Sequence, residues 1–395
     1  MGFNVSSMVL TTRIAAASTA VFLATCVYWT WSVNSVRRKR HRLRRELPSN
    51  LHTWRIPGNS TEAEEKIWRD LHDVFRDGGL TLWPHAFLST LKTPGFTYPI
   101  SSGFGYALPT ETSDDAGHVG RLRRFDYTNP LSRAARTRDG HDVIIRVIVV
   151  GREGHEHLKI LRRIASGENS LLSNNHALPM FAEFQFEDII FGIFPKVGAS
   201  IEDLYGYWAR NSVGDVVDIL MQMLEGLAFI HSNNVAHRDA FRDNFVVQWH
   251  PESLRTMKIS PSRPRVYLID FEVAIDFPAE CPADERVCTG YPIGGSFGEL
   301  EAYTRPHAPE LVSGKPYSPF KLDVWQLGTS FLNTLPTFRS TITSIDAVLE
   351  GMTNTDPEQR LDAQDALNRL RVAVNSMSPE SLLIEPLVVT GHEED

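Results

Sequence analysis

The chain has 395 residues, of which 42% are apolar and 22% are charged. This length and composition allow a large hydrophobic core and exclude a disordered or collagen-like chain. Forty lysines and arginines against 48 aspartates and glutamates give a formal net charge of −8. Such a balance argues against a nucleic-acid-binding protein. Three cysteines are too few for a disulfide framework, so we expect a reducing compartment for most of the chain.

The positive charge is concentrated near the N-terminus. Seven of the 40 lysines and arginines lie within residues 37–45. The remaining 33, set against the 48 acidic residues, leave −15 for everything outside that stretch. The sequence therefore combines a basic segment, assigned to residues 34–47, with an acidic body that we do not expect to bind nucleic acid.

The basic segment follows twenty residues without a charge, IAAASTAVFLATCVYWTWSV, at positions 14–33. As a helix this run would be about 30 Å long, which spans the core of a bilayer. Tyr28, Trp29 and Trp31 near its end suit the headgroup zone of a membrane. We therefore expect a single transmembrane helix at 14–33 after a short tail at 1–13. The basic side should face the cytoplasm and contact anionic lipid headgroups.

Two other interpretations of residues 14–33 remain open. A cleaved signal peptide normally has its positive charge before the apolar run, whereas here only Arg13 precedes it. A buried core helix would have to continue into an arginine-rich segment. The sequon at Asn59 tests the orientation, because a cytoplasmic asparagine is not glycosylated.

Residues 48–121 are predicted to form a helix followed by an irregular extension. Thr61 and Glu64 form a capping box, and Gly78-Gly79 ends the apolar periodicity that follows it. Residues 80–120 are rich in glycine, proline, serine and threonine and show no sustained period. A packing helix and a linker are the simplest interpretation.

The next part of the chain changes from short apolar runs to longer helical periods, which predicts an α+β fold. The domain is assigned to residues 122–375, and residues 376–395 to a C-terminal tail. Its clearest predicted elements are a β-branched central strand at 142–150, a helix at 154–164, one or two strands at 184–194, and a long core helix at 212–231.

Polar residues in the second half indicate chemistry with phosphate and a metal ion. Asp239 and Asn244 lie five residues apart after the long helix, and Asp270 follows an apolar strand. An aspartate can accept a proton from a hydroxyl group. Amide and carboxylate oxygens, completed by phosphate oxygens, suit Mg²⁺.

These residues belong to a series of motifs in a fixed order. The motifs are HRDAFRDN at 237–244, DFE at 270–272, APE at 308–310, DVWQLG at 323–328 and an arginine at 360. They resemble the eukaryotic protein-kinase signature of H-R-D-x-x-x-x-N, D-F-G, A-P-E and D-x-W-x-x-G. The run from HRDAFRDN through KLDVWQLG is similar to a divergent kinase-like family of mushroom-forming fungi.

The resemblance implies a two-lobed fold, with a small β-rich N-lobe and a larger helical C-lobe. It implies ATP and Mg²⁺ as cofactors, with Asp239 as the catalytic base and Asn244 and Asp270 as metal ligands. Arg146, at the usual lysine position of the central strand, would contact ATP together with Asn244 and Asp270.

The resemblance also implies structural roles for three residues. Glu310 and Arg360 would form a buried ion pair, and Asp323 would hold the catalytic loop from below.

The N-lobe departs from the kinase pattern at each of its usual landmarks. The segment at 129–140 has one glycine, so it lacks the usual loop around phosphates. Arg146 replaces the lysine, and this exchange is not conservative. His157 stands at the place of the helix glutamate, with Glu156 one residue earlier. Whether Glu156 faces Arg146 is left open by the sequence.

The catalytic elements depart from the pattern at two further positions. Glu272 replaces the glycine of D-F-G and adds a carboxylate beside Asp270. Phe241 stands where the catalytic loop of serine/threonine kinases has a lysine, and the loop does not match the tyrosine-kinase form either.

The sequence therefore predicts a membrane-anchored protein-kinase-like protein with a cytoplasmic domain that transfers the γ-phosphate of ATP to a protein hydroxyl. The alternative is a pseudokinase scaffold with little or no turnover, because the glycine loop, lysine and aligned glutamate are missing. A small-molecule kinase would share the catalytic residues, but the A-P-E and D-V-W-x-x-G elements favour the protein-kinase side. The protein substrate or signalling partner stays open, as does serine/threonine against tyrosine specificity.

Overall fold

A computed structural model describes residues 5–56, 61–87, 89–94, 123–127, 129–198, 201, 211–250, 253, 263–297 and 303–390, without the side chains of 5–24, 61 and 87. The chain divides into two compact units, Met1–Ser49 and Asn50–Asp395. Helix α1 (Val5–Glu46) makes up most of the first unit and runs without a break from the apolar segment into the basic one. The expected helix at 14–33 is therefore part of a longer helix.

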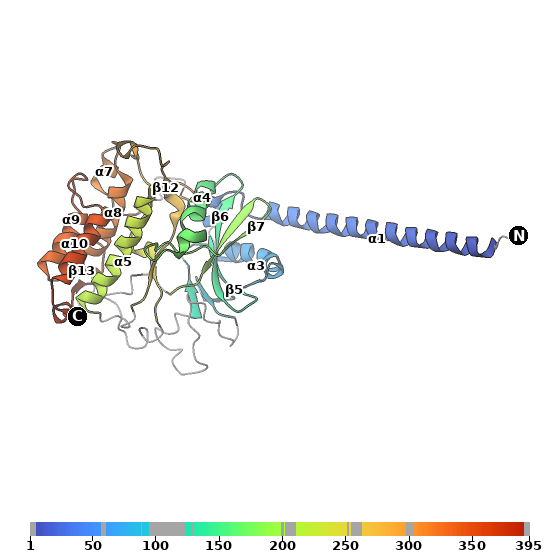
Figure 1. Ribbon diagram of the computed structural model, residues 1–395, viewed down its shortest axis with the longest axis horizontal. Helices are drawn as coiled ribbons and strands as arrows, with labels where there is room; N and C mark the ends of the chain where they lie inside the picture. The colour runs from blue at the N-terminus through green and yellow to red at the C-terminus, as the bar shows by residue number, and fades with distance from the viewer. Residues whose placement is uncertain are drawn as a thin grey trace. The chain divides into compact units, whose positions relative to one another are not determined.

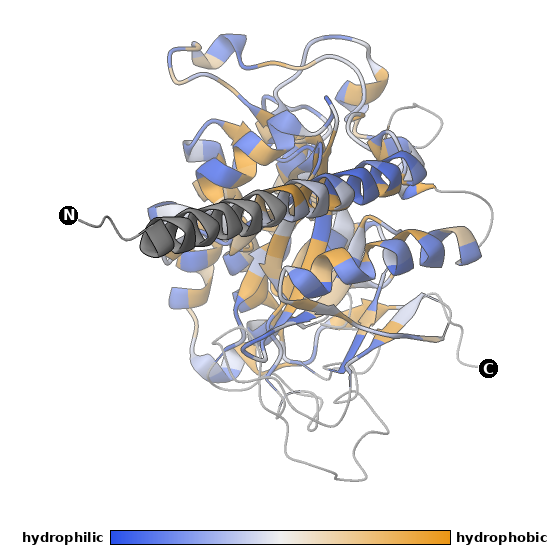
Figure 2. Ribbon diagram, turned by 90° about the vertical axis from the view of Figure 1, so that its right-hand side faces the viewer, coloured by the Kyte–Doolittle hydropathy of each residue, from blue (hydrophilic) through white to orange (hydrophobic). Residues whose placement is uncertain are grey.

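The described part of α1 is polar toward its C-terminal end (Figure 2). The rings of Tyr28, Trp29 and Trp31 are exposed. Among the residues whose side chains are described, no helix has the length and apolarity needed to cross a membrane. Residues 14–24 of the expected span lie outside that set.

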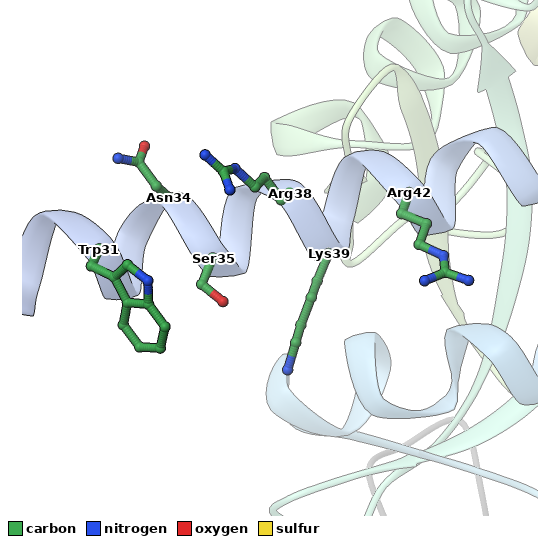
Figure 3. A pocket seen from close by; sticks show the side chains of 6 residues that line it. All are labelled: Trp31, Asn34, Ser35, Arg38, Lys39 and Arg42. Carbon is green, nitrogen blue, oxygen red and sulfur yellow. The ribbon is translucent and has the colours of Figure 1, made fainter.

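Aromatic, polar and basic side chains line a shallow groove along α1 (Figure 3). Its lining residues are Trp31, Asn34, Ser35, Arg38, Lys39 and Arg42. All of them belong to the same helix, so this groove is a feature of the helix surface and not an enclosed binding pocket.

The second unit begins with a five-stranded antiparallel sheet, whose order is β1-β5-β6-β8-β7. The strands are β1 (Leu80–Leu82), β5 (Ser132–Thr137), β6 (Asp142–Val150), β7 (Ala182–Phe186) and β8 (Ile189–Pro195). The predicted central strand is confirmed as β6, which has a neighbour on each side and ends in four buried residues. The region at 184–194, predicted to form one or two strands, contributes to two, β7 and β8.

The extension helix packs against this sheet. Helix α3 (Thr61–Asp77) buries Trp68 and Phe75, and the ring of Phe75 lies 5.0 Å from that of Phe191 in β8. Gly78 follows, at a point where a β-carbon would lie 2.3 Å from the ring of Phe184. The glycine pair that ends the helix therefore also permits this close approach.

Three short strands lie between residues 80 and 92, where the sequence predicted irregular structure. β1 joins the main sheet, and a second sheet of three strands consists of β2 (His85–Phe87), β3 (Thr90–Lys92) and β4 (Arg124–Asp126). The connection between the first two strands of the main sheet thus runs from 83 to 131. The segment at 129–140, to which the sequence assigned the missing phosphate loop, contains β5 and its turn into β6.

The C-terminal part is mainly helical, and its helices lie together away from the sheet (Figure 1). They are α4 (His155–Ile164) beside the sheet, and α5 (Val213–Ser232), α7 (Pro309–Val312), α8 (Pro319–Leu332), α9 (Thr343–Met352) and α10 (Ala363–Asn375) in the helical part. The predicted core helix is confirmed as α5. Ser212 caps it and shares a reciprocal capping box with Asp215. The chain is thus α+β and kinase-like, with a sheet first and a helical part second.

A buried ion pair joins two distant parts of the helical region. Both guanidinium nitrogens Nη1 and Nη2 of Arg360 donate to the carboxylate of Glu310, at 2.6 and 3.0 Å. Arg360 also donates to the carbonyls of Asn354 and Lys321, each at 2.9 Å. The expected Glu310–Arg360 pair is confirmed, and its hydrogen bonds compensate the cost of burying two charges.

Replacing Arg360 with methionine should lower the free energy of unfolding by about 3–5 kcal/mol, because Glu310 would be left buried and unpaired. The double variant Glu310→Leu/Arg360→Met removes both charges and should recover most of the loss. Arg162→Ala breaks an exposed bidentate pair with Glu183 and should cost at most about 1 kcal/mol. Urea unfolding of the four proteins measures these differences. Equal losses for Arg360→Met and Arg162→Ala would contradict the prediction.

Candidate active site

A buried carboxylate in α8 holds the loop that follows α5. Asp323 accepts hydrogen bonds from the backbone N–H groups of His237 and Arg238, at 2.8 and 2.6 Å. His231, in the last turn of α5, donates to the same carboxylate at 2.9 Å. The expected role of Asp323 is confirmed. The cost of burying it is offset by three donors, two of them from the loop that it orders.

Gln326 and Ser330, one and two helical turns further along α8, continue this support. The side chain of Gln326 accepts from the N–H of Ala240 and donates to the carbonyl of Arg238, each at 2.8 Å. Ser330 accepts from the N–H of Arg242 at 3.1 Å. Neither residue could be assigned this role from its motif alone. Their signal was the spacing of three and seven residues from Asp323, which places polar groups on one face of an otherwise apolar helix.

Asp239 lies at the centre of a set of short polar contacts. Arg305, in the segment before α7, donates to both of its carboxylate oxygens at 3.1 Å. The amide nitrogen of Asn244 donates at 2.7 Å to Oδ2 and to the backbone carbonyl of Asp239. Arg305 also donates to Asp243 at 2.6 Å. The structure thus brings Asp239 and Asn244 together, as the spacing predicted, and adds an arginine that sequence reasoning did not identify.

Burial and charge act on Asp239 in opposite directions. Burial raises the pKa of Asp239 above that of an ordinary aspartate, although the charge and hydrogen bonds of Arg305 partly oppose the shift. A carboxylate with a raised pKa is a stronger proton acceptor than one exposed to water.

Asp270 is held beside this loop by backbone contacts. The strands β10 (Phe245–Val247) and β11 (Val266–Leu268) are paired. The N–H of Ile269 donates to the carbonyl of Asn244, and His237 Nε2 donates to the carbonyl of Ile269, both at 2.9 Å. Asp270 itself has a φ of 65°, in the left-handed region that is costly for a residue with a β-carbon. The two loops therefore present Asn244 and Asp270 from adjacent backbone positions.

Arg146 of β6 pairs with two carboxylates of this loop. Its Nη2 donates to Asp270 at 2.6 Å and to Glu272 at 3.3 Å. Burial alone would raise the pKa of Asp270, but the charge of Arg146 outweighs it and the pKa is lowered. Burial and the neighbouring charge of Asp270 raise the pKa of Glu272. The extra carboxylate at the D-F-G glycine position is therefore the group whose own pKa is raised, mainly by burial, whereas the pKa of Asp270 beside it is lowered.

Helix α4 contributes no carboxylate to Arg146 in the described structure. Glu156, left open by the sequence, is exposed and lies 3.6 Å from Lys159 of its own helix. His157, at the expected glutamate position, is buried, and burial together with the charge of Arg146 lowers its pKa to about 3. A neutral histidine thus stands near Arg146, and the arginine draws its counter-charges from Asp270 and Glu272 instead.

A second arginine reaches this site from the N-terminal extension. Arg55, at the end of α2 (Leu51–Arg55), donates to Ser296 Oγ at 3.0 Å and lies 3.9 Å from the carboxylate of Glu272. Its guanidinium carbon lies 3.5 Å from the centre of the Phe297 ring. No local motif around Arg55 indicated this contact, because α2 is short and its partners lie more than two hundred residues later.

The donor set at this site suits a hard cation. Within the described residues, no group of three or more His, Cys, Asp or Glu side chains is placed to hold a metal ion. One carboxylate, one amide oxygen and the oxygens of a bound phosphate would nevertheless meet the preferences of Mg²⁺. Asp270 and Asn244 supply the first two, and the amide nitrogen of Asn244 is already committed to Asp239. The residues therefore fit a magnesium–nucleotide complex.

The buried state of His157 predicts an acid sensitivity of the fold. In the folded chain its pKa is about 3, against 6.5 for an ordinary histidine. As the pH falls below 6.5, the unfolded chain binds a proton that the folded chain does not, so stability decreases. Between pH 7 and pH 5 this difference should cost about 2 kcal/mol in wild type and be absent in His157→Leu.

Urea unfolding at the two pH values measures the difference. His155→Leu, which changes an exposed neighbour, should keep the wild-type dependence. A His157→Leu protein with the wild-type pH dependence would show that His157 is not responsible.

Comparison with known proteins finds a similarity that covers part of this site. Residues 197–339 match the family model described as the protein kinase domain. The match includes Asp239, Asn244 and Asp270 and begins after β8, so Arg146 lies outside it.

Serine/threonine-protein kinases are distant relatives of this chain. It is 31% identical over 182 residues to the serine/threonine-protein kinase ksp1 of Schizosaccharomyces pombe, covering 44% of this chain and 33% of the relative. It is 28% identical over 106 residues to the serine/threonine-protein kinase CAK1 of Saccharomyces cerevisiae, covering 27% of this chain and 25% of the relative. The matched regions thus span a third or less of these relatives' own length.

Proposed function

We propose that this chain is a protein kinase that transfers the γ-phosphate of ATP to a hydroxyl group of a protein. The observation that carries the proposal is the joined pair of loops around Asn244. Its side chain contacts Asp239 at 2.7 Å, and its backbone carbonyl accepts from the N–H of Ile269, the residue before Asp270. One residue thus links the candidate base to the candidate metal ligand. The protein-kinase match over 197–339 supports the same assignment.

In the proposed reaction Asp239 accepts the proton of the acceptor hydroxyl. The hydroxyl oxygen forms a bond to the γ-phosphorus, the bond from that phosphorus to the β,γ-bridging oxygen breaks, and ADP leaves. Asn244 and Asp270 would hold Mg²⁺, which neutralises charge on the phosphates when bound. Arg146 would offer its guanidinium to a phosphate, because it lies beside the metal ligand Asp270, to which its Nη2 donates at 2.6 Å.

Serine or threonine is the proposed acceptor. The named relatives are serine/threonine-protein kinases, and this is the support for the assignment. The run from HRDAFRDN through KLDVWQLG further leads us to group the chain with the divergent fungal kinases that it resembles.

A second candidate function is a pseudokinase scaffold. Arg305 donates to both oxygens of Asp239, and Arg146 donates to Asp270, so both candidate catalytic carboxylates are paired with arginines. Such pairs can hold the loops in place without turnover. A protein of this kind would bind a signalling partner through the same fold and would tolerate loss of the base.

Phosphate transfer by the full chain distinguishes the two functions. With Mg²⁺ and radiolabelled ATP, wild type should label itself or a peptide library. Asp239→Asn and Asp270→Asn should each reduce the rate about a hundredfold or more, because one loses the base and the other a metal ligand. Asp284→Asn changes an exposed aspartate outside the candidate site and should leave the rate unchanged. Equal incorporation in wild type and both site variants would contradict the kinase proposal, and an absence of nucleotide-induced thermal stabilisation would favour the scaffold.

We also propose that α1 anchors the chain to a membrane with the body in the cytoplasm. The support comes from the sequence of residues 14–33, which has no charge, from the exposed Tyr28 and tryptophans that follow, and from the basic segment after them. Basic side chains on α1 would gain about 1 kcal/mol each beside anionic lipids.

Alkaline carbonate extraction after synthesis in the presence of microsomes tests the anchor. Wild type should stay in the membrane pellet, and Leu23→Arg/Ala24→Arg should release it, because two charges at the centre of a span cost about 5 kcal/mol or more. Leu383→Arg, at an exposed position elsewhere, should leave the wild-type behaviour intact. Release of wild type would contradict the anchor, and glycosylation of Asn59 would contradict the proposed orientation.

A further inference from the structure

Arg305 occupies the place where the proposed reaction needs a positive charge. The group in transfer carries negative charge on its three equatorial oxygens, and an acceptor hydroxyl must lie within about 3 Å of the base. Asp239 and Asp243 both lie next to that position and would repel the phosphate. A cation fixed between them would offset this repulsion.

The catalytic loop lacks the lysine that usually supplies that cation, and neither of its two arginines faces Asp239. Phe241 stands two residues after Asp239, where the related loop of serine/threonine kinases has a lysine, and the phenyl ring is buried. The guanidinium carbon of Arg305 lies 5.0 Å from the centre of this ring. An arginine from a segment more than sixty residues later therefore covers the site of the missing lysine.

The two arginines of the loop itself, Arg238 and Arg242, are committed to other partners. Arg238 donates to the carbonyls of Val273 and Tyr291, at 3.2 and 3.1 Å. Arg242 donates to the carbonyl of Ser330 and to those of Leu335 and Pro336, at 2.6–2.7 Å. Both are buried and support the backbone.

Arg305 differs from these arginines in its partners and in its exposure. Within the described part of the chain it is the one cation that donates to Asp239, and it reaches Asp243 as well. About a third of its side chain is exposed to solvent. A substrate arriving at Asp239 can therefore reach the guanidinium, whereas the buried arginines are enclosed by carbonyl groups.

We infer that Arg305 is a catalytic residue that takes the place of the loop lysine and contacts the phosphoryl group during its transfer. The inference rests on the proposed kinase function. Arg305 would keep Asp239 oriented before substrate binds and would donate to an equatorial phosphate oxygen as charge develops there. The Arg305–Asp239 contact, which occupies the base in the absence of substrate, would thus become part of the active arrangement.

Steady-state kinetics of the full chain test this role, with Mg·ATP and either water or the best-labelled library peptide as acceptor. Arg305→Ala should lower kcat about a hundredfold while the KM for ATP changes by less than about threefold, because the contact forms mainly in the transition state. Arg305→Lys keeps the charge but loses the two-point contact with Asp239, and should lose about tenfold. Arg339→Ala breaks an exposed pair with Glu350 and should keep the wild-type kcat.

Chemical rescue separates a catalytic role from a structural one. Millimolar guanidinium should restore part of the turnover of Arg305→Ala and none of that of Asp239→Asn. The double variant Phe241→Lys/Arg305→Ala, which returns a lysine to the loop, should also exceed Arg305→Ala in turnover. Unchanged thermal melting of Arg305→Ala would exclude unfolding as the cause of its loss.

The outcomes distinguish this inference from the proposed function. If wild type transfers phosphate and Arg305→Ala has an equal or higher kcat, Arg305 is not catalytic, and a higher kcat identifies it as a block on the base. If Arg305→Ala is slow but neither guanidinium nor Phe241→Lys restores any turnover, its role is structural. If wild type neither transfers phosphate nor binds Mg·ADP with aluminium fluoride, the kinase function fails, and the role of Arg305 fails with it.

Discussion

The arrangement of the candidate site depends on the buried carboxylate of Asp323. It fixes two successive N–H groups, those of His237 and Arg238, just before Asp239. His237 then donates to the carbonyl of Ile269 and so sets the position of the loop that carries Asp270. A carboxylate fully removed from water is stable only with such donors, so the fold and the loop order each other.

The charges of the N-lobe are rearranged around Arg146. A neutral His157 occupies the helix position from which a carboxylate would face the strand, and Asp270 and Glu272 supply the counter-charges instead. Arg55 adds a further cation near Glu272 and connects the extension to Ser296. Arg146, His157 and Glu272, which stand at the usual lysine, glutamate and glycine positions, therefore compensate one another in charge. Removing Arg146 alone would leave Asp270 without the arginine that pairs with it.

The sequence predicted elements well where local pattern and burial agree. The β-branched run at 142–150 and the amphipathic run at 212–231 appear as β6 and α5. The sequence-based prediction was wrong for β1, because its three residues have no periodic signal of their own and form a strand through pairing with β5. Asp239 and Asn244 could be paired from their spacing in one loop. Arg305 and Arg55 could not, because their contacts span 66 and 217 residues of chain.

The amino-acid sequence by itself determined the central strand and core helix, the motif residues of the catalytic loop and the separation of a basic segment from an acidic body. These properties follow from residue type and local spacing, which need no knowledge of distant contacts. Only the tertiary structure decided which arginine faces which carboxylate. An ion pair depends on positions within a few ångströms, and the chain brings such positions together through sheet pairing and helix packing over distances that local pattern does not encode.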